Sequence, residues 1–250
     1  MIALLLTTSL LASSTVALRD GAGHLMCSGV VVAPRAVLTA AHCFPPPGDI
    51  DDEDLGPREV CFGPKSNDCH PIPIARYAIH PNYSIAGLAN DLAIAFLAED
   101  APVTPAELSP AEIHPGEILE AVGYGRTVAD DPASAGNEHA TPLTALRFER
   151  GKLVHDEGTC TGDSGGPLLV DGAVAAITSS GEPGCVGEGT ATPILPARAW
   201  LDAELAPKPA ASCATAPGRA RSGSLALLAV LLLTWCARRG TSPTARCRAW

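Results

Sequence analysis

The sequence predicts an all-β protein, and two features of the chain support this fold class. Short runs rich in Val, Ile, Leu and Ala recur along the 250 residues. Clusters of Gly, Pro and Asp separate these runs, and such clusters mark turns. Regular short strands joined by turns are typical of an antiparallel barrel or sandwich. A chain of this length can form one large domain or two small ones.

The expected elements can be followed from the N-terminus. A first hairpin is expected from residues 15–18 and 26–32, with turn residues at 20–23 between them. Further apolar runs lie at 30–39, 72–79, 92–97, 118–124, 143–148, 168–170 and 173–179. A short closing helix is expected over residues 197–205, with Trp200 and Leu201 docking it on the core.

Both ends of the chain carry apolar segments outside the expected domain at 15–206. Residues 1–14 resemble a secretory signal sequence without its usual positive start, and a strand of the domain is the alternative. Residues 207–223 are a Pro/Ala-rich linker that cannot build a core. The final segment, 224–250, contains an apolar run shorter than the roughly 20 residues of a membrane span.

Charge and residue spacing exclude several classes of function. The net charge is −10 and the domain has no basic block, so no nucleic acid partner is expected. No CxxC or HxxxH spacing occurs, so neither a metal nor another cofactor is expected. The acidic run at 49–54 could suggest calcium, but it lacks the glycine and ligand spacing of an EF-hand. We expect a solvated loop there.

Nine cysteines are many for a reduced cytosol and favour an oxidising compartment. Cys61 and Cys69 are close enough in sequence to close a small local loop. Three others, Cys213, Cys236 and Cys247, lie C-terminal to the expected domain. This separation suggests that the cysteines of the domain are structural, whereas those of the tail have a different role.

Three motifs carry the chemistry. Residues 160–167 read CTGDSGGP, residues 38–43 read LTAAHC, and residues 90–97 read NDLAIAFL. GDSGGP alone could be a turn, since Gly, Asp, Ser and Pro are all turn residues. Together, however, the motifs place His42, Asp91 and Ser164 in one of the chain orders known for a Ser-His-Asp triad. That order favours a nucleophilic serine.

In this order the motifs resemble those of the chymotrypsin/trypsin family of serine proteases. The resemblance implies two antiparallel six-stranded β-barrels, with the active site between them and a short C-terminal helix. It implies that Ser164 is the nucleophile, that His42 is the general base and then the acid, and that Asp91 orients the imidazole. The amides of Gly162 and Ser164 match the family's oxyanion hole. We expect a monomer that acts on protein or peptide substrates.

The resemblance also implies the positions of disulfides and substrate contacts. The implied disulfides are Cys27–Cys43 and Cys160–Cys185, beside the local pair Cys61–Cys69. The floor of the specificity pocket maps to Gly158 and its walls map to Gly181 and Gly189. Ser180 stands where the family usually has tryptophan, and Ser179 matches the serine that contacts the triad aspartate. An open, uncharged pocket predicts cleavage after apolar or aromatic residues.

Asp163 matches the aspartate that pairs, in the family, with a newly freed N-terminal amine. The family's mature enzymes begin with a sequence of the Ile-Val-Gly-Gly type at a fairly fixed distance before the residue matched by Cys27. No such sequence stands at that distance here. Either the true start lies further upstream, or Asp163 has another partner, and both alternatives stay open at this stage.

The C-terminal segment resembles the sorting tails of myxobacterial surface proteins. By this resemblance Cys213 is a processing or anchoring position, on which a sorting protease would act, and an ordinary tail anchor is the alternative. We therefore expect an exported serine endopeptidase, either secreted or at a bacterial cell surface or outer envelope, with a transient or retained C-terminal membrane anchor. The competing function is a catalytically silent, protease-like module that binds proteins. An esterase is disfavoured, because its GxSxG elbow belongs to an α/β pattern.

Overall fold

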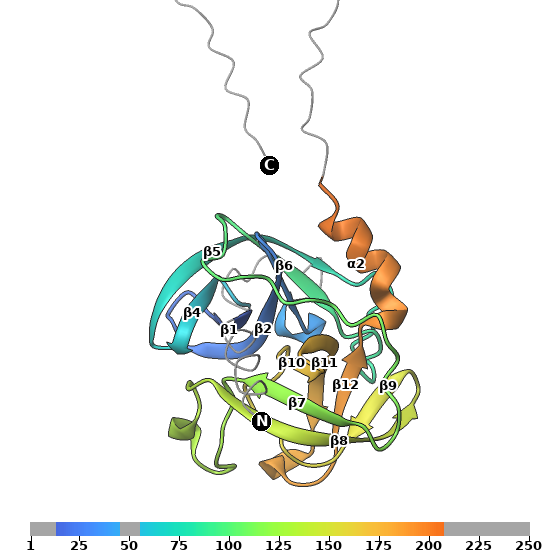
Figure 1. Cartoon of the computed structure of the whole chain (residues 1–250). Coiled ribbons are helices and arrows are strands. Elements are labelled where there is room, and N and C mark those ends of the chain that lie inside the picture. The colour runs from blue at the N-terminus through green and yellow to red at the C-terminus, as the bar shows by residue number, and fades with distance from the viewer. Residues whose placement is uncertain (1–13, 46–55, 208–250) are drawn as a thin grey trace, which may run out of the picture. The chain divides into compact units, whose positions relative to one another are not determined.

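In the part of the chain that the structure describes, twelve strands close into two antiparallel six-stranded barrels, which confirms the predicted fold class (Figure 1). The computed structural model describes residues 14–45 and 56–207. The first barrel has the strand order β1-β2-β3-β6-β5-β4, and the second has the order β10-β11-β12-β9-β8-β7. Closure leaves neither sheet with an unpaired edge.

The strands of the first barrel are β1 (Thr15–Arg19), β2 (Leu25–Ala33), β3 (Ala36–Thr39), β4 (Glu59–Lys65), β5 (Asp68–Ile79) and β6 (Ala93–Leu97). Those of the second are β7 (Ile118–Gly123), β8 (His139–Glu149), β9 (Lys152–His155), β10 (Pro167–Val170), β11 (Ala173–Gly181) and β12 (Gly189–Pro193). Short 3-10 turns lie between strands at η2 (Ala41–Cys43), η3 (Pro132–Ser134) and η4 (Pro183–Cys185), and a fourth, η5 (Leu195–Ala197), comes after β12. The chain then enters the helix α2 (Arg198–Leu205).

The apolar run predicted at 30–39 becomes a tight hairpin. Pro34 and Arg35 separate β2 from β3, with Val31 paired to Val37 and Ala33 paired to Ala36. A proline cannot donate to a strand ladder, and its fixed φ suits a turn. Only Ala40 and Ala41 separate this hairpin from His42, so the strand pairing sets the place of that side chain.

The hydrophobic core continues from the first barrel into the second and under the helix. Leu38 and Ile94 are completely buried on paired strands of the first barrel. Ile177 of β11 and Leu201 of α2 belong to the same core cluster. Trp200 also packs its ring edge-on against His80, with ring centroids 4.9 Å apart. Trp200 and Leu201 thus dock the helix as the sequence predicts.

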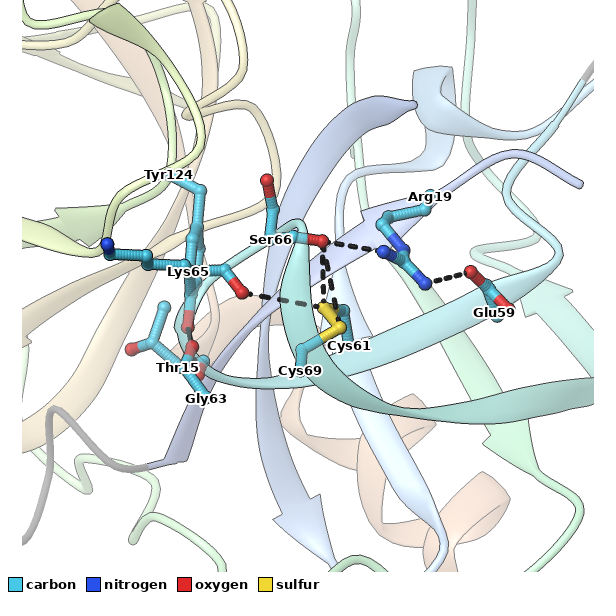
Figure 2. The surroundings of a disulfide bond; sticks show 9 residues. All are labelled: Thr15, Arg19, Glu59, Cys61, Gly63, Lys65, Ser66, Cys69 and Tyr124. Atoms are coloured by element: carbon cyan, nitrogen blue, oxygen red, sulfur yellow. Dashed lines mark hydrogen bonds and ion pairs between the residues drawn. A yellow bond between two sulfur atoms is a disulfide. The ribbon is translucent and has the colours of Figure 1, made fainter. Parts of the chain in front are cut away.

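Tyr124, directly after β7, ties the second barrel to the first (Figure 2). Its hydroxyl lies 2.7 Å from the carbonyl oxygen of Gly63 and 3.3 Å from that of Thr15, and the ring is completely buried. The Cys61–Cys69 disulfide joins β4 to β5 beside this contact. Burial raises the pKa of the Tyr124 hydroxyl, so this group stays neutral and donates a hydrogen bond at physiological pH.

The structure contains the three expected disulfides. Besides the pair on β4 and β5, one bond joins Cys27 to Cys43 and another joins Cys160 to Cys185. Three predicted segments lie outside the described residues: the signal-like stretch at 1–14 except for Ser14, the acidic loop at 49–54, and the tail from residue 208 onward, including Cys213. Within the described ranges no helix is long and apolar enough to cross a membrane.

Candidate active site

His42 lies in the η2 turn, and the first barrel holds its backbone on both sides. Only Ala40 separates the turn from β3, and the neighbouring Cys43 is bonded to Cys27 of β2. The backbone amide of His42 donates to Oδ1 of Asp91 at 2.9 Å. The ring is a quarter exposed, so one edge reaches solvent while the other is fixed.

Asp91 is completely buried and holds the imidazole through its second oxygen. Oδ2 lies 2.7 Å from His42 Nδ1 and accepts a hydrogen bond from Ser179 Oγ at 2.6 Å. Burial acts to raise the pKa of Asp91, but its hydrogen bonds with His42 and Ser179 outweigh burial and lower that pKa. The carboxylate is therefore ionised, and Nδ1 of His42 carries the proton that it accepts. The other ring nitrogen, Nε2, is then free to take a proton.

Ser164 and His42 line the same cleft between the barrels, which has a volume of about 700 Å³. Ser164 lies in the turn before β10, and its carbonyl oxygen accepts a hydrogen bond from the amide of Ser28 at 2.8 Å. Gly162 also lines the cleft, with φ +103°, and an added Cβ would lie 2.9 Å from the Cα of Gly125. Only glycine fits this backbone without displacing its neighbour.

Ser28, on β2, is a site residue that the sequence motifs did not indicate. Its hydroxyl donates to the carbonyl oxygen of Gly162 at 2.8 Å and accepts from the amide of Tyr124 at 3.0 Å. All three groups are buried, so the first barrel directly holds the loop that precedes Ser164. No local pattern marks this role, because Gly162 and Tyr124 are distant in sequence.

The predicted substrate contacts divide into two groups. Ser179, Ser180 and Gly181 line the cleft as expected from the resemblance. The Ser180 hydroxyl also lies 2.8 Å from Thr190 Oγ1 on the neighbouring β12, which makes this wall polar where a tryptophan would be apolar. Of the described residues that line the cleft, Glu182 alone carries a carboxylate, and it is exposed.

Gly158 and Gly189 are not among the residues that line the cleft. Gly158 packs instead against Leu143, whose Cδ2 would lie 2.4 Å from an added Cβ. Gly189 is paired with His155 across β12 and β9, and an added Cβ would lie 2.3 Å from His155 Cε1. The completely buried imidazole of His155 therefore occupies the space next to Gly189.

Metal ligation is not supported at this site. In the two described ranges, the one group of three nearby metal-ligating side chains is Cys27, His42 and Cys43. Both sulfurs are tied up in a disulfide, so they offer no thiolate to a metal.

The comparisons with known proteins identify the family. The family model described as Trypsin matches residues 12–201, so the chain belongs to the trypsin family of serine peptidases. Among its relatives, chymase of Rattus norvegicus is 29% identical over 198 residues, which cover 70% of this chain and 77% of the chymase. Trypsin of Saccharopolyspora erythraea is 28% identical over 197 residues, covering 70% of this chain and 83% of that trypsin.

A solved structure shows the same fold. Neuropsin, described as a serine protease expressed in the limbic system of mouse brain, aligns with a TM-score of 0.64 and 24% identity. The alignment covers 77% of this chain and 94% of neuropsin. The two-barrel architecture is therefore the one found in that protease.

Proposed function

We propose that this chain is an exported serine endopeptidase in which His42, Asp91 and Ser164 form the catalytic triad. The observation that carries the proposal is the His42–Asp91 pair. Nδ1 of His42 lies 2.7 Å from the buried carboxylate of Asp91, and His42 lines the same cleft as Ser164. A serine hydroxyl is a weak nucleophile until a base takes its proton. The His42 imidazole, oriented by Asp91, supplies that base.

The reaction follows from these roles. Ser164 Oγ attacks the carbonyl carbon of the scissile bond while its proton passes to His42 Nε2. The amides of Gly162 and Ser164 bind the oxyanion, each contributing roughly 3 kcal/mol to lowering the barrier. The intermediate collapses to an acyl-enzyme as His42 protonates the leaving amine. Water, deprotonated by the same imidazole, then releases the acid and regenerates the Ser164 hydroxyl.

A fluorophosphonate probe tests this assignment, because it labels only an activated serine. We expect the exported wild-type chain to be labelled and Ser164→Ala to be unlabelled, with both proteins folded by circular dichroism. Ser84→Ala is the matched control, since Ser84 is an exposed serine that does not line the cleft. A folded wild type that resists labelling would instead support the silent, protein-binding module.

We propose that cleavage follows apolar or aromatic residues. Support comes from the lining of the cleft, which includes Leu25, Met26 and Gly181. Among the lining residues that the structure describes, none is a buried carboxylate that could pair with a Lys or Arg side chain. A panel of peptide amide substrates that differ only before the scissile bond tests the preference. Higher kcat/KM for Arg or Lys than for Phe or Leu would overturn it, and would point to Glu182.

We also propose that the enzyme works outside the cytoplasm. Three disulfides in one domain suit an oxidising compartment. Mass spectrometry of both ends of the mature chain, with cell fractionation, tests export and any processing near Cys213. A full-length chain in the cytoplasm with reduced cysteines would contradict the proposal.

A further inference from the structure

The carboxylate of Asp163, the residue before Ser164, is enclosed by backbone. Its Oδ1 accepts a hydrogen bond from the amide of Gly125 at 2.8 Å, and its Oδ2 accepts one from the amide of Cys160 at 2.9 Å. The side chain is only 6% exposed. A Cβ added at Gly123 or Gly125 would lie 2.3 Å and 2.5 Å, respectively, from atoms of this carboxyl group. The two glycines therefore leave room for the carboxylate and for little else.

A buried carboxylate is costly without a positive partner. His139, the first residue of β8, can supply this positive charge when protonated, since its Nε2 lies 3.5 Å from Asp163 Oδ1. Strand pairing fixes the approach, because His139 lies opposite Gly123 in the β7–β8 register. The two side chains thus meet through the fold of the second barrel.

The surroundings of the His139 ring select its charged form. The other ring nitrogen, Nδ1, lies 3.2 Å from the carbonyl oxygen of Asn137. Both nitrogens therefore face acceptors, and only an imidazolium donates to both. The adjacent carboxylate of Asp163, 3.5 Å from Nε2, raises the pKa of His139 against the opposing effect of burial.

One other titratable group acts on His139 directly. Glu138, the preceding residue, is partly buried, and burial raises its pKa to about 7. As pH rises through that value, the new charge on Glu138 favours the proton on His139. Tyr124, directly after β7, stays neutral through this range, because burial and the charge of Glu138 both raise its pKa. The charges on Asp163 and Glu138 thus both favour the proton on the imidazole.

We propose that the His139 imidazolium is the internal counter-ion that holds Asp163, and thereby the Gly162–Ser164 oxyanion hole, in its working position. This inference rests on the proposed function. The amides of Cys160 and Gly125 fix the carboxylate, and the amide of Asp163 returns a hydrogen bond to the carbonyl oxygen of Cys160 at 3.0 Å. The loop before Ser164 is thus folded around this one carboxylate.

The chemical consequence concerns how the site is switched on. A histidine side chain is present as soon as the barrel folds, so His139 needs no peptide bond to be cut before it can pair with Asp163. Its charge depends on pH instead. Loss of the proton leaves the carboxylate without a counter-ion, and the Gly162 and Ser164 amides then lose their alignment. His139 acts through Asp163 and is a positioning residue.

The test compares the full chain with His139→Gln, which cannot be charged, and His139→Lys, which remains charged. The fluorophosphonate labelling rate is measured from about pH 5 to about pH 10, a range that spans the ordinary pKa values of histidine and nearly that of lysine. We expect wild-type labelling to fall at alkaline pH. His139→Gln should lose about 10²-fold, the effect of one oxyanion-hole donor, and His139→Lys should restore labelling and move its alkaline limit upward.

His24→Gln is the matched control, because His24 also lies beside an aspartate, Asp20, but its side chain is 79% exposed. It should label like wild type at every pH. With a peptide amide substrate, the loss in His139→Gln should appear in kcat rather than in KM, since a displaced oxyanion hole impairs the transition state. Wild-type rates and an unchanged pH profile in His139→Gln would overturn the proposal.

A second readout does not depend on activity. In the Ser164→Ala chain, NMR titration should give His139 a pKa above the ordinary histidine value of about 6.5, and Asp163→Asn should lower it. An unshifted His139 that ignores Asp163→Asn would refute the ion pair. A wild type that never labels, with the NMR shift present, would refute the proposed function and the positioning role but retain the ion pair.

Discussion

Replacing Ser28 with alanine tests whether the first barrel holds the loop that precedes the nucleophile. Ser28→Ala removes one hydroxyl and leaves two buried groups without a partner, the carbonyl oxygen of Gly162 and the amide of Tyr124. Each buried group left unpaired costs about 1–3 kcal/mol. Relaxation and water entry offset part of the sum, so we expect a loss of about 3 kcal/mol in the free energy of unfolding.

Guanidinium unfolding with the disulfides intact measures this loss, and the melting temperature should fall by roughly 6–12 °C for a domain of this size. Ser84→Ala is the control, because the Ser84 hydroxyl is exposed, and its effect should stay within about 0.5 kcal/mol. Labelling of Ser164 should also slow, since the Gly162 peptide loses its anchor. An unfolding free energy of Ser28→Ala close to that of Ser84→Ala would refute the reasoning.

Three further changes should have measurable effects. Ser179→Ala removes a donor to the Asp91 carboxylate, so kcat/KM should fall by about tenfold, equivalent to about 1.4 kcal/mol of a charge-assisted hydrogen bond; unchanged kinetics would contradict the role. Gly189→Ala should destabilise the fold by about 1–3 kcal/mol through its clash with His155, and adding His155→Ala should recover part of the loss. Burial lowers the pKa of His155, so the unfolded chain binds its proton first and stability should fall as pH drops below about 6.5. Urea unfolding at several pH values should show a shallower acid slope in His155→Gln.

Strand prediction succeeded where apolar residues form a continuous run. The run at 92–97 became β6 because buried strands in a barrel interior need apolar side chains. The strand β12 (Gly189–Pro193) has no such run, since it reads GTATP. It is a strand because β11 and β9 pair with it on both sides. Pairing with partners can thus make a strand from residues with little preference for one.

Site residues were likewise predictable where local sequence defines them, and not where distant parts of the chain do. His42, Asp91 and Ser164 stand in motifs whose local sequence shapes a turn, so each could be assigned before any contact was known. Gly158 and Gly189 were assigned by position to the specificity pocket, but the structure places neither of them along the cleft. Their surroundings depend on loop lengths and on His155, which spacing from Ser164 does not describe.

The sequence alone determined the fold class and the three motifs around His42, Asp91 and Ser164, because turns and apolar runs act over a few neighbouring residues. Only the tertiary structure decided which partner meets Asp163. The β7–β8 register brings His139 to that carboxylate, and β2 brings Ser28 to Gly162. Contacts of this kind join residues from different strands, so no local pattern records them.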